Sequence, residues 1–146
     1  MSFNFSVTKK RTFLALMLLL ITLTTHGADM NSLSDYQWKN RLILVQASDE
    51  NAGEIEMLRS ARAGVDDRDV VWFVNTGSEV VSNQQSLSNS LESEIKTLLE
   101  KGRSDERVLL IGKDGCIKSR EVSLDLDAIF RRIDAMPMRM REMRVD

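Results

Sequence analysis

Three short runs of hydrophobic residues recur along the chain, within residues 41–48, 69–75 and 107–113. Each run continues for four or five positions without a polar residue, and the second run is rich in β-branched and aromatic side chains. Uninterrupted apolar runs of this length are typical of strands that are covered on both faces of a sheet. The pattern therefore predicts three buried strands.

The segments that follow the second and third runs differ in character. Asp114 and Gly115 form a two-residue hairpin signal after the third run. This signal predicts a fourth strand over residues 117–122, antiparallel to the third. Residues 76–90, after the second run, consist mainly of Ser, Asn, Gln and Gly, which is typical of a polar surface loop.

Three further segments repeat hydrophobic residues at helical spacing. The first begins at a capping box of Asn51 and Glu54, and the second ends at Gly102. The third begins at a capping Ser123 and ends at Pro137. The hydrophobic positions of the three helices are, in order, Ile55, Leu58, Ala61 and Val65, then Leu91, Ile95, Leu98 and Leu99, then Leu126, Ile129, Phe130, Ile133 and Met136.

The resulting order of elements is βαβ, then α, then ββα. This order is the thioredoxin-like arrangement, a mixed four-stranded sheet with helices on both faces, and a ferredoxin-like fold is the main alternative. The buried first two strands and the polar loop favour the thioredoxin-like arrangement, because parallel strands covered by helices carry continuous apolar runs. We therefore predict an α/β, thioredoxin-like domain over residues 41–146, preceded by a lead-in over residues 28–40.

The N-terminal segment has the layout of a cleaved secretory signal peptide over residues 1–27. A basic cluster is followed by an uncharged run over residues 12–24 and then by small residues around Gly27 and Ala28. The uncharged run is shorter than the ~20 residues that a spanning helix needs, so we expect no stable membrane span after cleavage. The cut is expected after Gly27 or Ala28, with an uncleaved anchor as the alternative. The protein is therefore predicted to be exported, to the periplasm in a Gram-negative bacterium and otherwise to the outside.

Composition excludes several classes of function. The chain has 22 acidic and 20 basic residues, and cleavage would remove three of the basic ones. Nucleic acid is therefore not an expected partner, because phosphate binding needs clustered, unopposed basic residues. The only histidine, His26, lies in the predicted signal peptide, which excludes Ser-His and Cys-His catalysis in the mature domain. The single cysteine, Cys116, cannot form an internal disulfide.

Three segments of the chain resemble one uncharacterised bacterial family. They are residues 36–41 (YQWKNR), residues 110–115 (LIGKDG) and residues 133–139 (IDAMPMR), the last followed by Glu142 and Met143. The family is a domain of unknown function, grouped with peroxiredoxin-like proteins of the thioredoxin fold and similar to domains of animal extracellular sushi-repeat proteins. The resemblance implies the fold and no particular activity. Cys116 departs from the family pattern, in which a second glycine is expected after Gly115.

The residues that thioredoxin chemistry requires are missing. Its nucleophilic cysteine lies where the first strand turns into the first helix, because the helix N-terminus lowers the pKa of the thiol. Here that turn, residues 48–51, reads SDEN and has no cysteine. A cis-proline is also expected before the third strand, but the only proline is Pro137. We therefore predict no catalytic residue and no cofactor.

Two residue groups offer alternative chemistry. Cys116 lies between Lys113 and Lys118, whose charges would lower the pKa of its thiol, so a weak thiol-dependent oxidoreductase is one alternative. Thioethers are soft ligands suited to Cu(I), so a copper binder is another. Its ligands would be the methionines of the C-terminal segment, namely Met136, Met138, Met140 and Met143.

Arginines alternate with these methionines, and their charges oppose the binding of a cation. We expect Met138 to pack against apolar surface and Arg139, Arg141 and Arg144 to form a possible partner surface. The leading hypothesis is an exported, redox-inactive, thioredoxin-like protein-binding module that binds another exported protein or an envelope component.

Overall fold

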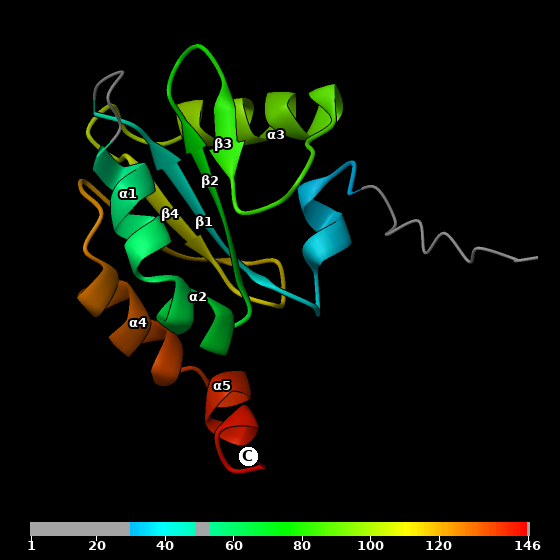
Figure 1. The fold of residues 1–146 in the computed structure, drawn as a ribbon, viewed down its shortest axis with the longest axis vertical. Helices are drawn as coiled ribbons and strands as arrows, with labels where there is room; N and C mark the ends of the chain where they lie inside the picture. The colour runs from blue at the N-terminus through cyan, green and yellow to red at the C-terminus, as the bar shows by residue number, and fades with distance from the viewer. Residues whose placement is uncertain (1–29, 49–52, 146) are drawn as a thin grey trace, which may run out of the picture.

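The computed structural model describes residues 30–48 and 53–145. The predicted signal peptide and the predicted capping residue Asn51 lie outside these ranges. The elements, in chain order, are η1 (Leu33–Tyr36), β1 (Arg41–Gln46), α1 (Gly53–Ser60), α2 (Arg62–Asp67), β2 (Val70–Asn75), β3 (Val80–Ser82), α3 (Asn89–Glu100), β4 (Val108–Ile111), β5 (Ile117–Glu121), α4 (Leu126–Asp134) and α5 (Pro137–Glu142) (Figure 1). None of the helices in the described ranges has the length and apolar character that crossing a membrane requires.

The sheet is mixed, with strand order β3-β2-β1-β4-β5. β1 pairs in parallel with β2 and antiparallel with β4, and the hairpin β4-β5 is antiparallel as predicted. The predicted strand count of four is wrong, because β3 lies within the segment predicted to be a loop. β3 is only three residues long, and polar side chains extend its contact with β2: Ser82 Oγ donates to the Trp72 carbonyl, and Asn83 Oδ1 accepts from the Trp72 N–H.

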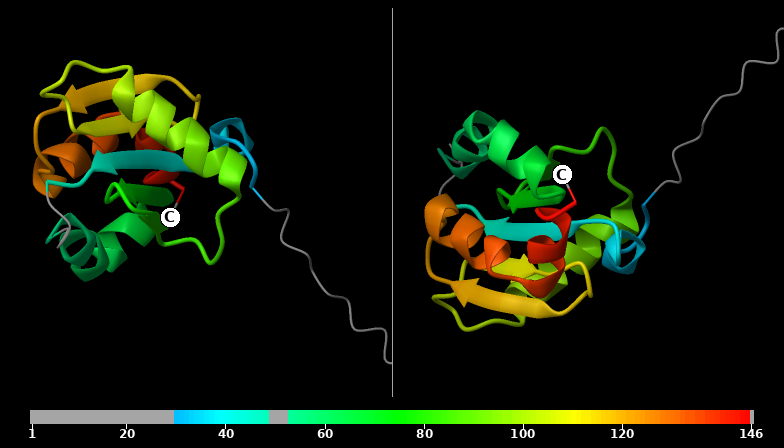
Figure 2. Two further views of the ribbon diagram at one scale, coloured as in Figure 1. Left: turned by 90° about the horizontal axis from the view of Figure 1, so that it is seen from above. Right: turned by 90° about the horizontal axis from the view of Figure 1, so that it is seen from below.

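Helices cover both faces of the sheet, with α1, α2 and α4 on one face and α3 and η1 on the other (Figure 2). Alternate residues of β1 enter the two cores, so Ile43 packs with α1, α2 and α4, whereas Leu44 packs with α3. Both side chains are fully buried, and burying a side chain of this size contributes about 1.5–3 kcal/mol. Because both faces of β1 are buried, its sequence does not show the alternation of polar and apolar residues that marks a half-exposed strand.

Helix boundaries differ from the predicted ones in three places. The first predicted helix is divided at Ala61 into α1 and α2. The last helix is capped by Asp125, whose carboxylate accepts from the Ala128 N–H at 2.9 Å, and not by Ser123. The last predicted helix was expected to end at Pro137, but α4 ends at Asp134 and Pro137 begins α5. Proline suits the first position of a helix, because the N–H that it lacks would have no partner within the helix there.

The connection between β4 and β5 is longer than the predicted two-residue turn. The Gly112 N–H donates to the Cys116 carbonyl and the Gly115 N–H donates to the Gly112 carbonyl, both at 2.9 Å. Gly115 has a φ of +79°, a region that a residue without Cβ occupies at little cost. The side chain of Gln37 lies against this glycine, so the turn and the lead-in before β1 are packed together.

Candidate functional site

The turn after β1 is where a thioredoxin-like enzyme would carry its nucleophile. Glu54, in the first turn of α1, accepts hydrogen bonds from the Ser48 hydroxyl at 2.6 Å and from the Ser48 N–H at 3.2 Å. Burial raises the pKa of Glu54, but these hydrogen bonds and the charge of Arg107 outweigh burial and lower it. A carboxylate with a lowered pKa is a weak general base, so the pair fixes the turn and is poorly suited to activate the hydroxyl. The remaining turn residues, 49–52, lie outside the described ranges.

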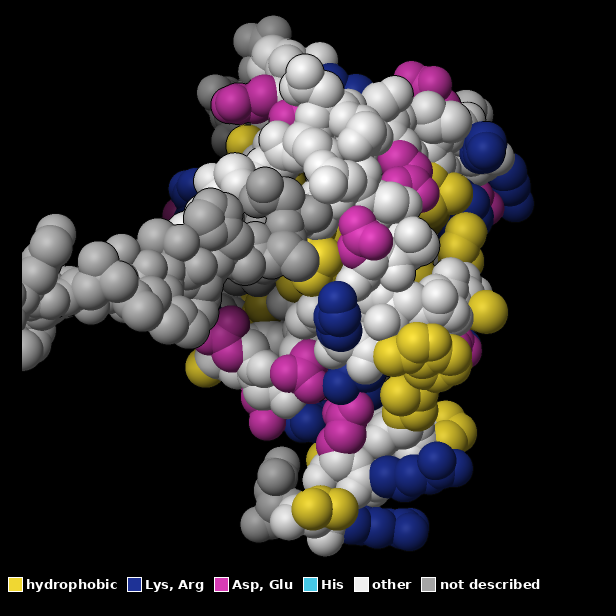
Figure 3. All heavy atoms as spheres, turned by 90° about the vertical axis from the view of Figure 1, so that its right-hand side faces the viewer, with side chains coloured by type: hydrophobic (Ala, Val, Ile, Leu, Met, Phe, Trp, Pro, Cys, Tyr) yellow, Lys and Arg dark blue, Asp and Glu magenta, His cyan; other side chains and the backbone are white. Residues whose placement is uncertain are grey.

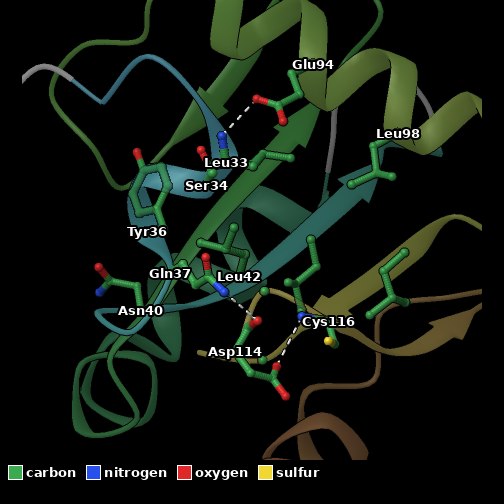
Figure 4. A pocket seen from close by; sticks show the side chains of 14 residues that line it. Leu33, Ser34, Tyr36, Gln37, Asn40, Leu42, Glu94, Leu98, Asp114 and Cys116 are labelled. Carbon is green, nitrogen blue, oxygen red and sulfur yellow. Dashed lines mark hydrogen bonds between the residues drawn. The ribbon is translucent and has the colours of Figure 1, made fainter.

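Cys116 lies at the opposite end of the sheet from this turn. β4 runs antiparallel to β1, so the chain leaving β4 at Ile111 is beside Leu42 at the start of β1, whereas Ser48 follows the end of β1. The exposed thiol lines a cavity of about 340 Å³ together with Gln37 and Leu98 (Figure 4). The structure therefore does not bring the cysteine to the position of thioredoxin chemistry.

The two lysines expected to act on this thiol are paired with carboxylates. Lys118 Nζ lies 2.6 Å from Asp114, and Lys113 Nζ lies 2.8 Å from both Asp69 and Glu142. The Cys116 N–H donates to the Asp114 carboxylate at 3.1 Å, so Asp114 shapes the turn as well. Nothing in this geometry favours the thiol-dependent alternative, which stays a prediction.

A network of ion pairs joins the three segments that carry the family resemblance. Glu142 of α5 receives two hydrogen bonds, at 3.1 and 3.2 Å, from the fully buried guanidinium of Arg41 and one at 2.8 Å from Lys113. Arg41 also donates to the Arg68 carbonyl at 2.9 Å. Although burial raises the pKa of Glu142, these bonds and the two positive charges lower it overall. The start of β1, the β4-β5 turn and α5 are thereby held together.

Arg139 belongs to the interior and not to an exposed partner surface, which corrects the prediction for this residue. It is only 5% exposed and donates to the Asp67 carbonyl at 2.8 Å, with further contacts to the carboxylates of Asp67 and Asp134. A hydrogen bond from Arg68 lowers the pKa of Asp134, and Arg139 adds to the effect. Arg141 and Arg144 are exposed, and their contact with a partner stays a prediction.

The four methionines of the copper alternative have unequal environments. Met136 and Met138 are half-buried, whereas Met140 and Met143 are exposed. Met138 and Met140 are two positions apart on α5, and side chains at that spacing lie on different sides of a helix. In residues 30–48 and 53–145, no group of three or more His, Cys, Asp or Glu side chains is placed to hold a metal ion. The copper hypothesis gains no support from these positions.

A cavity of about 440 Å³ lies beside the ion-pair network, and we call it the Trp38 pocket. Its apolar lining comes from Trp38, Met136, Pro137 and Met138, and its polar lining from Arg41, Gly112, Lys113, Asp114, Lys118 and Arg141. Trp38 is 65% exposed. Sequence patterns missed this pocket, because a lone tryptophan in a connecting segment has no periodicity. The sequence feature that could have indicated the pocket is the family resemblance, because the three segments that carry it (residues 36–41, 110–115 and 133–139) supply most of the lining.

Residues 32–142 match the model of a family described as a domain of unknown function, DUF4174. The chain belongs to this family. The expected family of unknown function is therefore confirmed, and the match spans all three resemblance segments. The chain has no match among curated proteins.

Among solved structures, the chain is similar to the reduced 2-Cys peroxiredoxin of Plasmodium vivax. The two share 18% sequence identity with a TM-score of 0.51, and the aligned region covers 76% of this chain and 84% of that one. Similarity at this level concerns the fold alone. It confirms the predicted thioredoxin-like arrangement, with the fifth strand as the correction.

Proposed function

We propose that this DUF4174 chain is an exported, redox-inactive, thioredoxin-like module that binds another exported protein or an envelope component without a cofactor. Export rests on the signal-peptide pattern of residues 1–27. The resemblance to domains of animal extracellular sushi-repeat proteins supports the same location outside the cytoplasm, which would be the periplasm in a Gram-negative bacterium.

One observation carries the proposal. The turn after β1 has no cysteine, and the only cysteine of the chain lies beyond β4 at the other end of the sheet. A thioredoxin-fold enzyme needs a thiolate at a helix N-terminus, and thiol exchange within one chain needs a second thiol. A protein with this fold and without that site retains a stable scaffold whose exposed surface can bind partners.

The test is an assay of the purified protein for insulin disulfide reduction and for peroxide consumption. We expect no turnover above buffer, and the same result for Cys116→Ser. Turnover by the wild-type protein that is lost in Cys116→Ser would overturn the proposal in favour of a thiol-dependent enzyme. Turnover that survives the substitution would also contradict redox inactivity, and it would show that a group other than the thiol is responsible.

A further inference from the structure

The backbone holds Trp38 outward in a conformation that is unusual for its type. Its φ is +66°, a left-handed value that is strained for a residue other than glycine. The conformation is held by a hydrogen bond from the Trp38 N–H to the Lys113 carbonyl at 2.6 Å and by one from Gln37 Nε2 to the Asp114 carbonyl at 2.9 Å. The backbone that carries the indole is therefore fixed before any partner arrives, which reduces the ordering cost of binding.

The apolar lining beside the indole is of the kind found at the centre of protein interfaces. Met136, Pro137 and Met138 lie where α4 gives way to α5, and they line the pocket together with Trp38. Tryptophan and methionine are enriched at protein interfaces, and methionine adapts its shape to a bound side chain. On the face seen in Figure 3, hydrophobic side chains gather beside basic ones toward the end of the molecule formed by α5.

The charge of the pocket determines the sign of its ligand. Arg41, Lys113 and Lys118 are paired with the carboxylates of Asp69, Asp114 and Glu142. Arg141 also lines the pocket and is exposed, and within the described residues it has no carboxylate partner. In addition, the buried Nε of Arg41 has no acceptor among those residues. The pocket thus has one surplus positive charge beside an apolar wall.

We propose that the Trp38 pocket binds a peptide segment in which an acidic side chain stands next to a large apolar one. The apolar side chain contacts Trp38 and Met138, and the carboxylate pairs with Arg141. This inference rests on the proposed function as a binding module and names the chemistry of the partner. The pocket volume is about 440 Å³. Pockets that bind small ligands typically have volumes of ~300–1,000 Å³, so this pocket is large enough for the side chains of a short peptide segment.

The experiment begins with selection of a random-peptide phage library on the purified protein. We expect enrichment of sequences that place Asp or Glu next to Phe, Leu, Ile or Met. The enriched peptide is then synthesised, and its affinity is measured by calorimetry for the wild type and three variants. Trp38→Ala and Arg141→Glu are each expected to weaken binding by roughly tenfold or more, as for central interface residues. Arg144→Glu, the matched control, makes the same charge change outside the pocket and is expected to change affinity by less than about twofold.

Thermal melts show whether each variant is folded. If Trp38→Ala does not fold, the comparison of Arg141→Glu with Arg144→Glu tests the inference without it. Absence of acidic-apolar sequences, or equal loss in Arg141→Glu and Arg144→Glu, would overturn the inference. Binding to phosphatidylcholine-phosphatidylglycerol vesicles without any selected peptide would overturn it in favour of a membrane surface. A redox-active protein that still binds the peptide would contradict only the proposed function, whereas a redox-inactive protein that selects no such peptide would contradict only this inference.

Discussion

Arg139 illustrates how a residue's role depends on partners distant in sequence. The alternation of Met and Arg over residues 136–141 resembles a solvated, partly basic segment, so the sequence predicts an exposed side chain. Its main partner, Asp67, lies 72 positions earlier, at the end of α2. No local pattern reports such a contact, and only the packing of α5 against the end of α2 buries the guanidinium.

We expect Arg139→Ala to lower the free energy of unfolding by about 1.5 kcal/mol, because the buried guanidinium and its hydrogen bonds to Asp67 and Asp134 are lost, while the partly exposed carboxylates of these two residues remain hydrated. Arg141→Ala, in the same helix but exposed, is expected to change it by less than about 0.5 kcal/mol. Urea unfolding of both variants measures the difference. Equal stabilities would show that the contacts of Arg139 contribute nothing, as the sequence alone suggested.

Stability is also expected to depend on pH through Asp134 and Glu142. Their pKa values are lowered in the folded protein, so the unfolded state binds more protons as the pH falls. Their contribution is fully present above the ordinary carboxyl values of about 4 and is lost as the pH falls through the lowered folded values. In urea titrations at a series of pH values, Asp134→Asn should flatten this acid dependence, whereas the exposed control Glu100→Gln should not. An unchanged profile for Asp134→Asn would contradict the assignment.

At the scale of elements, the strands with continuous apolar runs were predicted because burial on both faces leaves an unmistakable sequence pattern. β3 was missed because three residues are too few to show a period, and its edge position is stabilised by the side chains of Ser82 and Asn83. The start of α4 was placed two residues early, because Ser123 and Asp125 are both good capping types. Sequence alone gives no means of choosing between them.

The structure makes that choice testable. Asp125→Ala should lower the free energy of unfolding by about 1 kcal/mol, since it removes the acceptor of the Ala128 N–H. Ser123→Ala should change it by less than about 0.5 kcal/mol. Thermal or urea unfolding of the two variants decides the matter, and a larger cost for Ser123→Ala would place the helix start where the sequence predicted it.

At the scale of the whole molecule, the two ends of the sheet have different roles. At the end of the sheet where β1 finishes lies the position that is catalytic in thioredoxin-fold enzymes, here without a thiol. At the other end, where β1 begins, the three segments that carry the family resemblance meet and line the Trp38 pocket. The family and the fold followed from the sequence. The candidate site did not, because its lining comes from segments that are far apart in the chain.

Export is a separate property of the whole chain. We expect the full-length protein to leave the cytoplasm and a variant that lacks residues 1–27 to remain there, because the basic cluster and uncharged run would be absent. Cell fractionation followed by immunoblotting measures both. A full-length protein that stays in the cytoplasm would refute the predicted signal peptide.

The most direct measurement compares the two ends of the sheet in cells that export the protein. Two full-length variants are made, in which the photoreactive amino acid p-benzoylphenylalanine replaces either Trp38 or Ser48. Both residues are exposed. Cells that express each variant are then irradiated. We expect a discrete covalent adduct with another exported protein from position 38 and none from position 48. An adduct from position 48 alone, or from neither position, would contradict a binding module that uses the Trp38 end of the sheet.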